Sequence, residues 1–204
     1  MQTAMTISHS VAFFEQQFQH QLRETALRLN PFEEDALPWL RGEVLDFGCG
    51  LGNLAVAAAR RGCHVLALDG SATAIEHLRQ RARSQGLAIE AQQADLTDHR
   101  LPRQFDSIAA IGLLMFLDCA HARQQLAQLQ DCLRPGGVLA LNLLVQGTTY
   151  LDMFDPQQHC LQTAARWRQC FDGWQLERDE TQDFPAPGGR VKAFLTLIAR
   201  KPLG

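Results

Sequence analysis

Apolar positions between residues 43 and 144 alternate between short runs and longer stretches with helical spacing. The short runs are typical of buried strands, whereas the longer stretches are typical of amphipathic helices. The predicted strands cover residues 44–47, 64–68, 89–92, 105–111 and 138–144, and the predicted helices cover residues 54–61, 72–84 and 120–133. Because strands and helices alternate strictly, we expect a parallel sheet with right-handed crossovers.

The C-terminal part of the chain breaks this alternation. A helix is predicted at residues 157–170, and strands at 174–180 and 191–200 are separated by a turn rich in Pro and Gly at 185–189. Two strands that a turn joins pair antiparallel. The expected fold class is α/β: a Rossmann-like sheet of seven strands, five of them parallel and two forming an antiparallel C-terminal pair, with helices on both faces.

The first forty residues show a helical pattern of their own. Apolar side chains recur there at three- and four-residue spacing, at Phe13, Phe14, Phe18, Leu22, Ala26 and Leu29. This spacing predicts one amphipathic helix, which Asn30-Pro31 ends before a short acidic stretch. Since the sequence shows no repeat or linker, we expect a single domain over residues 1–204. Residues 1–42 would form a helical lead-in or lid, and residues 43–204 the core.

Composition narrows the classes of function. Hydrophobic residues make up 46% of the 204 residues and charged residues 20%, so a packed core is expected. The net charge of −3 lacks the basic surface with which proteins neutralise nucleic-acid phosphates. Neither a signal peptide nor an apolar run of membrane-spanning length is visible. We therefore expect a cytoplasmic monomer or homodimer that acts on a small molecule, with no nucleic-acid or membrane partner.

The six cysteines are scattered along the chain without any Cys-x-x-Cys pair. This spacing is unlike that of a metal site or of the disulfide framework of a small secreted protein. We expect reduced and mostly buried thiols, and no metal.

A glycine-rich segment follows the first predicted strand and precedes the first helix. Gly48, Gly50 and Gly52 alternate along it, and Asp46 precedes them. Glycines allow a ligand to approach the backbone closely, and the following helix offers free N–H groups to it. In α/β proteins, this position at the carboxyl ends of the strands binds nucleotides.

Two further carboxylates indicate which nucleotide is bound. Asp69 ends the second strand, 19 residues after Gly50, where an acidic residue holds ribose hydroxyls. These features alone leave NAD open. Asp95 follows the third strand, and its carboxylate can accept a hydrogen bond from the exocyclic amine of adenine.

Residues 43–144 resemble the core of the class I methyltransferases that use S-adenosylmethionine (SAM). The matching segments are residues 44–52, 67–69, 94–96, 105–106 and 133–137. The resemblance implies that SAM is the cofactor and S-adenosylhomocysteine the product. It assigns the ribose to Asp69, the adenine amine to Asp95 and the amino end of the ligand to Asp46. The residues implied to bind the cofactor are Asp46, Gly48, Cys49, Gly50, Gly52, Asp69, Gly70, Asp95, Leu96 and Ile111.

A narrower resemblance concerns the methyl acceptor. Residues 112–117, 174–180 and 194–201 are similar to the tellurite-resistance methyltransferases, which implies an acceptor of the tellurite or selenite type. The histidine-arginine pair that this family carries before its last strand is absent, and Arg190 and Lys192 are the local cations. Tyr150, the single tyrosine, and Arg190 are the candidate catalytic residues.

Two alternatives stay open at this point. A regulatory protein could bind SAM without turnover, because the glycine-rich segment contains no information about an acceptor. A nicotinamide-dependent oxidoreductase would need the sequence Gly-x-Gly-x-x-Gly, whereas this chain has Gly-x-Gly-x-Gly.

Overall fold

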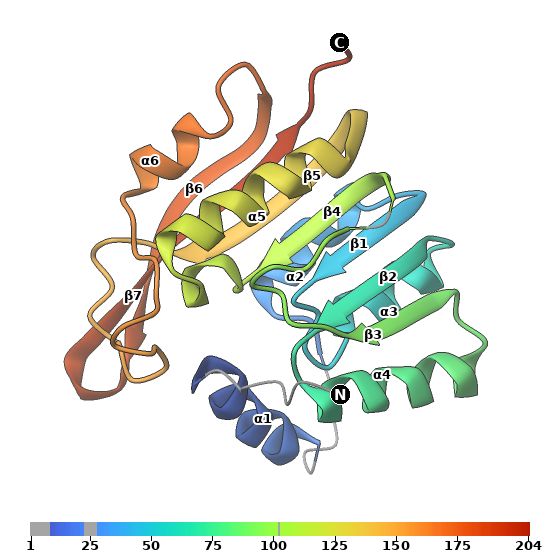
Figure 1. Ribbon diagram of the computed structural model, residues 1–204, viewed down its shortest axis with the longest axis horizontal. Helices are drawn as coiled ribbons and strands as arrows, with labels where there is room; N and C mark the ends of the chain where they lie inside the picture. The colour runs from blue at the N-terminus through green and yellow to red at the C-terminus, as the bar shows by residue number, and fades with distance from the viewer. Residues whose placement is uncertain (1–8, 23–27, 102) are drawn as a thin grey trace.

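A single twisted sheet of seven strands organises the molecule (Figure 1). The structure is a computed structural model, and it describes residues 9–22, 28–101 and 103–204. The strands are β1 (Glu43–Phe47), β2 (His64–Asp69), β3 (Ile89–Gln93), β4 (Phe105–Ile111), β5 (Leu133–Leu144), β6 (Gln175–Ala186) and β7 (Arg190–Arg200). The helices are α1 (His9–Gln21), α2 (Pro31–Ala36), η1 (Leu37–Trp39), α3 (Asn53–Arg60), α4 (Ala72–Gln85), η2 (Leu114–Phe116), α5 (Cys119–Cys132), α6 (Ala164–Gln169) and η3 (Pro187–Gly189).

The strand order is β3-β2-β1-β4-β5-β7-β6. Strands β1 to β5 are parallel, and β7 pairs antiparallel with both β5 and β6. The predicted fold class is therefore confirmed, including the antiparallel C-terminal pair.

Successive side chains of a strand point to opposite faces of the sheet. Alternate residues of each central strand are therefore buried on different faces. Val44 and Val65 pack with α3 and α4 on one face, whereas Leu45 and Leu66 pack with α5 on the other. Both faces are thus covered, as an interior parallel sheet requires. The carboxyl ends of the parallel strands meet at one edge, which faces α1 in Figure 1.

The N-terminal region differs from the prediction of one helix that ends at Asn30. Helix α1 stops at Gln21, and Asn30 begins a second helix, α2, as its N-cap. The Asn30 side chain accepts hydrogen bonds from the backbone N–H of Glu33, while the Glu33 carboxylate accepts one from the N–H of Asn30. This reciprocal capping box makes the predicted acidic stretch helical. Ala26, part of the predicted pattern, lies outside the described residues.

The C-terminal predictions need three corrections of length. The helix predicted at 157–170 begins only at Ala164, because Thr163 caps it and residues 159–163 form no regular structure. Strand β6 runs through Pro185 to Ala186, beyond its predicted end, since an outer edge strand tolerates a residue without an N–H. Strand β5 begins at Leu133, with a register shift against β4 before Val138.

The expectation that all cysteines are reduced is wrong. Cys119, at the start of α5, forms a disulfide with Cys160 in the segment after β5. The pair is 41 residues apart in the sequence, so only the fold brings the two thiols together. Four cysteines are free in the structure: Cys49, Cys63, Cys132 and Cys170.

Candidate functional site

A cavity of about 740 Å³ opens at the carboxyl ends of the parallel strands. This volume is within the range of small-molecule sites. The cofactor residues predicted from the sequence that line the cavity are Asp46, Gly48, Cys49, Gly50, Asp69, Gly70, Asp95, Leu96 and Ile111. The structure therefore brings these residues together around one space, although they come from four different strand ends.

The glycine-rich segment needs glycine for its backbone conformation. Gly48, Gly50 and Gly52 have φ angles of 86°, 50° and 73°, in the left-handed region that favours glycine. Gly52 does not line the cavity; it is the N-cap residue of α3. A Cβ at Gly52 would be 2.4 Å from Cδ1 of Leu78, so this glycine allows α3 to pack closely against α4.

Asp69 fixes the shape of the glycine-rich segment. Its Oδ2 accepts a hydrogen bond of 2.8 Å from the backbone N–H of Gly50, and its Oδ1 accepts one of 2.8 Å from the N–H of Ser71. Burial raises the pKa of this carboxyl above its ordinary value, against the effect of these hydrogen bonds. Each oxygen keeps a further lone pair that can accept a hydrogen bond from a ligand hydroxyl.

Asp46 is the most perturbed carboxyl of the site. Its side chain is 4% exposed, and its Oδ2 has no hydrogen-bond partner among the described residues. Burial raises its pKa to about 8, and the negative charges of Glu33 and Asp69 add to this effect. A buried acceptor without a donor is costly. The ammonium group of an amino-acid ligand would supply the missing donor and an opposite charge.

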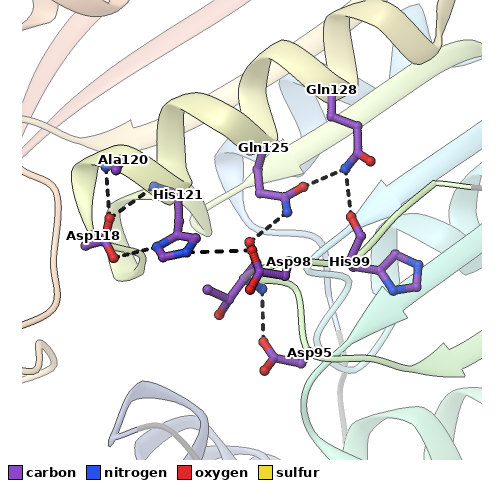
Figure 2. A network of polar contacts seen from close by, with 9 residues as sticks. Asp95, Asp98, His99, Asp118, Ala120, His121, Gln125 and Gln128 are labelled. Atoms are coloured by element: carbon purple, nitrogen blue, oxygen red, sulfur yellow. Dashed lines mark hydrogen bonds and ion pairs between the residues drawn. The ribbon is translucent and has the colours of Figure 1, made fainter.

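Asp95 belongs to a segment that α5 holds in place (Figure 2). Its Oδ1 accepts a hydrogen bond of 3.0 Å from the backbone N–H of Thr97. The buried amide of Gln125 donates to the carbonyl of Thr97 at 2.7 Å, and Gln128 donates to the carbonyl of His99 at 2.8 Å. Two glutamines of one helix thus position the loop that presents Asp95 to the cavity.

His121 lies at the same end of the cavity, between two carboxylates (Figure 2). Its Nδ1 is 2.5 Å from Oδ2 of Asp118, and its Nε2 is 3.6 Å from Oδ1 of Asp98. The hydrogen bond to Asp118 raises the pKa of the imidazole. With carboxylates facing both nitrogens, the imidazolium form is favoured, and it offsets part of the negative charge around Asp95.

Helix α1, near the N-terminus, contributes side chains that cover the cavity. Glu15 accepts hydrogen bonds from the hydroxyls of Ser71 and Thr73 at the start of α4. The ring of Phe18 lies directly beside Gly50, and the ring of Phe14 packs on that of Phe116 with 5.0 Å between centroids. The amphipathic pattern of the first residues thus places phenylalanines in the cavity wall.

The structure places Tyr150 and Arg190 outside the cavity lining. Arg190 forms two hydrogen bonds to Asp152, of 2.6 and 2.8 Å, and its guanidinium carbon lies 4.6 Å from the centroid of the Tyr150 ring. Nζ of Lys192 lies 4.7 Å from the same centroid, and Lys192 does line the cavity. A catalytic role for Tyr150 and Arg190 stays a prediction.

Glu33 and Asn142 are among the polar residues of the cavity that were not predicted from the sequence. Glu33 enters it from α2, and burial raises the pKa of its carboxyl. Asn142 enters it from β5, and it is 2% exposed. The Asn30-x-x-Glu33 capping pattern could have located α2, but no local pattern marks the asparagine of a buried strand.

Comparison with known proteins agrees with this geometry. Residues 44–137 match a family model described as "Methyltransferase domain". The chain is 32% identical over 127 residues to the ubiquinone biosynthesis O-methyltransferase of Haemophilus ducreyi, an overlap of 58% of this chain and 52% of that protein. It thus spans about half the length of that curated relative.

Solved structures share the fold over nearly the whole chain. TehB from Haemophilus influenzae superimposes with a TM-score of 0.73 at 19% identity, over 92% of this chain and 67% of that one. A complex of DhpI with SAM and HEP superimposes with a TM-score of 0.61 at 19% identity, over 98% of this chain and all of that one.

Residues 44–137 match the methyltransferase-domain family model, and the chain shares the fold of solved structures that include a complex with the cofactor SAM. The residues present fit this cofactor, because the unpartnered oxygen of Asp46 matches its ammonium group. Asp69 and Asp95 offer acceptors for its ribose and its adenine amine. Among the described residues, no helix is long and apolar enough to cross a membrane.

Proposed function

We propose that this protein is a SAM-dependent methyltransferase that acts on a small molecule. The observation that carries the proposal is the buried Asp46 carboxylate, without a partner among the described residues, beside a glycine-rich segment that lines a cavity of about 740 Å³. When bound, SAM supplies a methyl group on a positively charged sulfur. The protein then has mainly to align the acceptor with that group and exclude water.

The cavity extends beyond the cofactor residues, which leaves space for an acceptor. The lining residues that were not assigned to the cofactor include the apolar side chains of Phe14 of α1, Phe32 of α2, Met153, and Phe194 of β7. This wall is apolar and suits an organic molecule. The curated relative from Haemophilus ducreyi, by its name an O-methyltransferase of ubiquinone biosynthesis, supports an organic acceptor.

The oxyanion acceptor that the sequence resemblance implies is less well supported. Five carboxylates line the cavity, Glu33, Asp46, Asp69, Asp95 and Asp118, against the cations Arg28 and Lys192 and the imidazole of His121. Three of these carboxylates, Asp46, Asp69 and Asp95, are assigned to the cofactor. An oxyanion in the apolar part of the lining would lose its hydration with few cations to replace it, so tellurite or selenite would be bound weakly there. Tellurite and selenite are nevertheless included among the methyl acceptors that are tested.

The proposal is tested first by binding. Calorimetric titration should show saturable binding of SAM and none of NADH. Asp95→Ala should weaken SAM binding by about fivefold to tenfold, the effect of losing one hydrogen bond. Asp98→Ala is the matched control, because Asp98 neighbours Asp95 in the same loop but does not line the cavity. Equal affinities in the two variants would contradict the placement of the adenine.

Turnover separates the enzyme from a regulatory protein that only binds SAM. The SAM-loaded protein is offered amines, alcohols, phenols, tellurite and selenite, and the formation of S-adenosylhomocysteine is measured. Formation above the acceptor-free rate with at least one of them is the expected result. SAM binding without any acceptor-dependent product would favour the regulatory alternative.

A further inference from the structure

Asn142 lies on the floor of the cavity, on the same face of the sheet as Asp46. Asn142 is in register with Ile111 of β4 and with Thr196 of β7, and Asp46 is in register with Ala109 of β4. Because Ala109 and Ile111 are two residues apart, they share one face. Asn142 and Asp46 are therefore both on the side of the sheet that α2 covers.

The amide of Asn142 has one end that is bound and one that is free. Its Nδ2 donates a hydrogen bond of 2.9 Å to Oγ1 of Thr196 and lies 3.5 Å from the carbonyl oxygen of Leu195. Because that carbonyl can only accept, it fixes which end of the amide is the nitrogen. The Oδ1 atom is buried and has no partner in the part of the chain that the structure describes. A buried acceptor of this kind is stabilised by a donor from a ligand.

The surroundings of Asn142 suit an apolar body that carries such a donor. The rings of Phe32 and Phe194 have centroids 4.7 Å apart and line the same part of the cavity. The carboxylate of Glu33 adds a second acceptor at the cavity. The amino group of SAM supplies the donor that Asp46 lacks. Oδ1 of Asn142 is therefore available to the methyl acceptor.

We propose that Asn142 selects the methyl acceptor, and that this acceptor is an organic molecule with an apolar body and an N–H or O–H group that donates a hydrogen bond to Oδ1 of Asn142. This inference rests on the proposed function. It makes Asn142 a specificity-determining residue, and it disfavours simple oxyanions, because they have no apolar body to contact the rings of Phe32 and Phe194.

The test uses the full-length protein saturated with S-adenosylhomocysteine. Benzyl alcohol, benzylamine, toluene and benzoate have similar apolar bodies, and ligand-observed NMR titration gives their dissociation constants. We expect the two donors to bind more tightly than toluene and benzoate. Asn142→Leu, which keeps the branching and the number of side-chain heavy atoms, should reduce the preference for benzyl alcohol over toluene by about fivefold, as expected for one hydrogen bond. Thr196→Val is the matched control, because it keeps the Asn142 carbonyl, and it should retain the preference.

Each outcome decides the inference. It is overturned if toluene or benzoate binds as well as the donors, if neither donor binds, or if tellurite displaces benzyl alcohol. An unchanged preference in Asn142→Leu also overturns it. A loss of affinity for S-adenosylhomocysteine in Asn142→Leu, larger than in Thr196→Val, would assign Asn142 to the cofactor instead. Failure of the wild-type protein to bind S-adenosylhomocysteine is seen separately by calorimetry and overturns the proposed function, and this inference with it.

Discussion

The binding of the cofactor should depend on pH through Asp46. Burial raises the pKa of this carboxyl from 3.8 to about 8 in the ligand-free protein, so at pH 6 roughly one molecule in a hundred carries it ionised. The ammonium group of the ligand binds the ionised form. The dissociation constant of S-adenosylhomocysteine should therefore fall about tenfold per pH unit between pH 6 and pH 7, and level off near pH 8.

The assay is calorimetric titration between pH 6 and pH 7.5, in two buffers with different enthalpies of ionisation. Asp46 must lose its proton when the ammonium binds, so close to one proton should be released per ligand at pH 6. The difference between the heats in the two buffers measures this release. The range stops at pH 7.5 because the amino group of the ligand has its own titration, for which a pKa near 8 is ordinary.

Asp46→Asn identifies the group that is responsible. Four other groups of the cavity have raised pKa values, at Glu33, Cys49, Asp69 and His121, and these stay in the variant. Loss of the charge-assisted hydrogen bond should weaken binding at pH 7.5 by roughly 10- to 100-fold, and the pH dependence should largely disappear. A wild-type affinity that does not change from pH 6 to 7.5, or an equal slope in the variant, would refute the reasoning.

Three further predictions concern the cavity and its supports. Gly52→Ala should lower the free energy of unfolding by about 2–4 kcal/mol in chemical denaturation, because of its positive φ and the contact with Leu78; a loss below about 0.5 kcal/mol would contradict this packing. Reduction of the disulfide, or Cys119→Ser, should cost up to about 4 kcal/mol for a separation of 41 residues, and a reductant should have no further effect on the variant's thermal unfolding. Phe18→Ala should weaken binding of S-adenosylhomocysteine by about fivefold or more in calorimetry, because α1 covers the glycine-rich segment; an unchanged affinity would show that α1 does not close the site.

The sequence could predict those parts of the site that depend on local pattern and on topology. Asp69 and Asp95 follow predicted strands, and the carboxyl ends of parallel strands meet at one edge of a sheet. Their convergence on one cavity therefore follows from the alternation of strands and helices alone. Gly50 and Asp69 lie at the ends of the neighbouring strands β1 and β2, and the structure joins the two by a hydrogen bond of 2.8 Å.

The parts that were not predicted depend on contacts between distant residues. The role of Asn142 rests on which face of β5 it occupies and on the helix that covers that face. Cys119 and Cys160 meet only because the segment after β5 folds back onto η2, where the N–H of Cys160 donates to the carbonyl of Met115. Neither residue is part of a motif. The same segment contains Tyr150, which contacts Arg190 and Lys192 and does not line the cavity.

The most direct test of the central claim is a crystal structure of the full-length protein with S-adenosylhomocysteine. We expect density for the ligand in the cavity of about 740 Å³, with its amino nitrogen within hydrogen-bond distance of Oδ2 of Asp46, its ribose at Asp69 and its adenine amine at Asp95. Ligand density at another place, or an Asp46 carboxylate that stays without a partner in the complex, would contradict it.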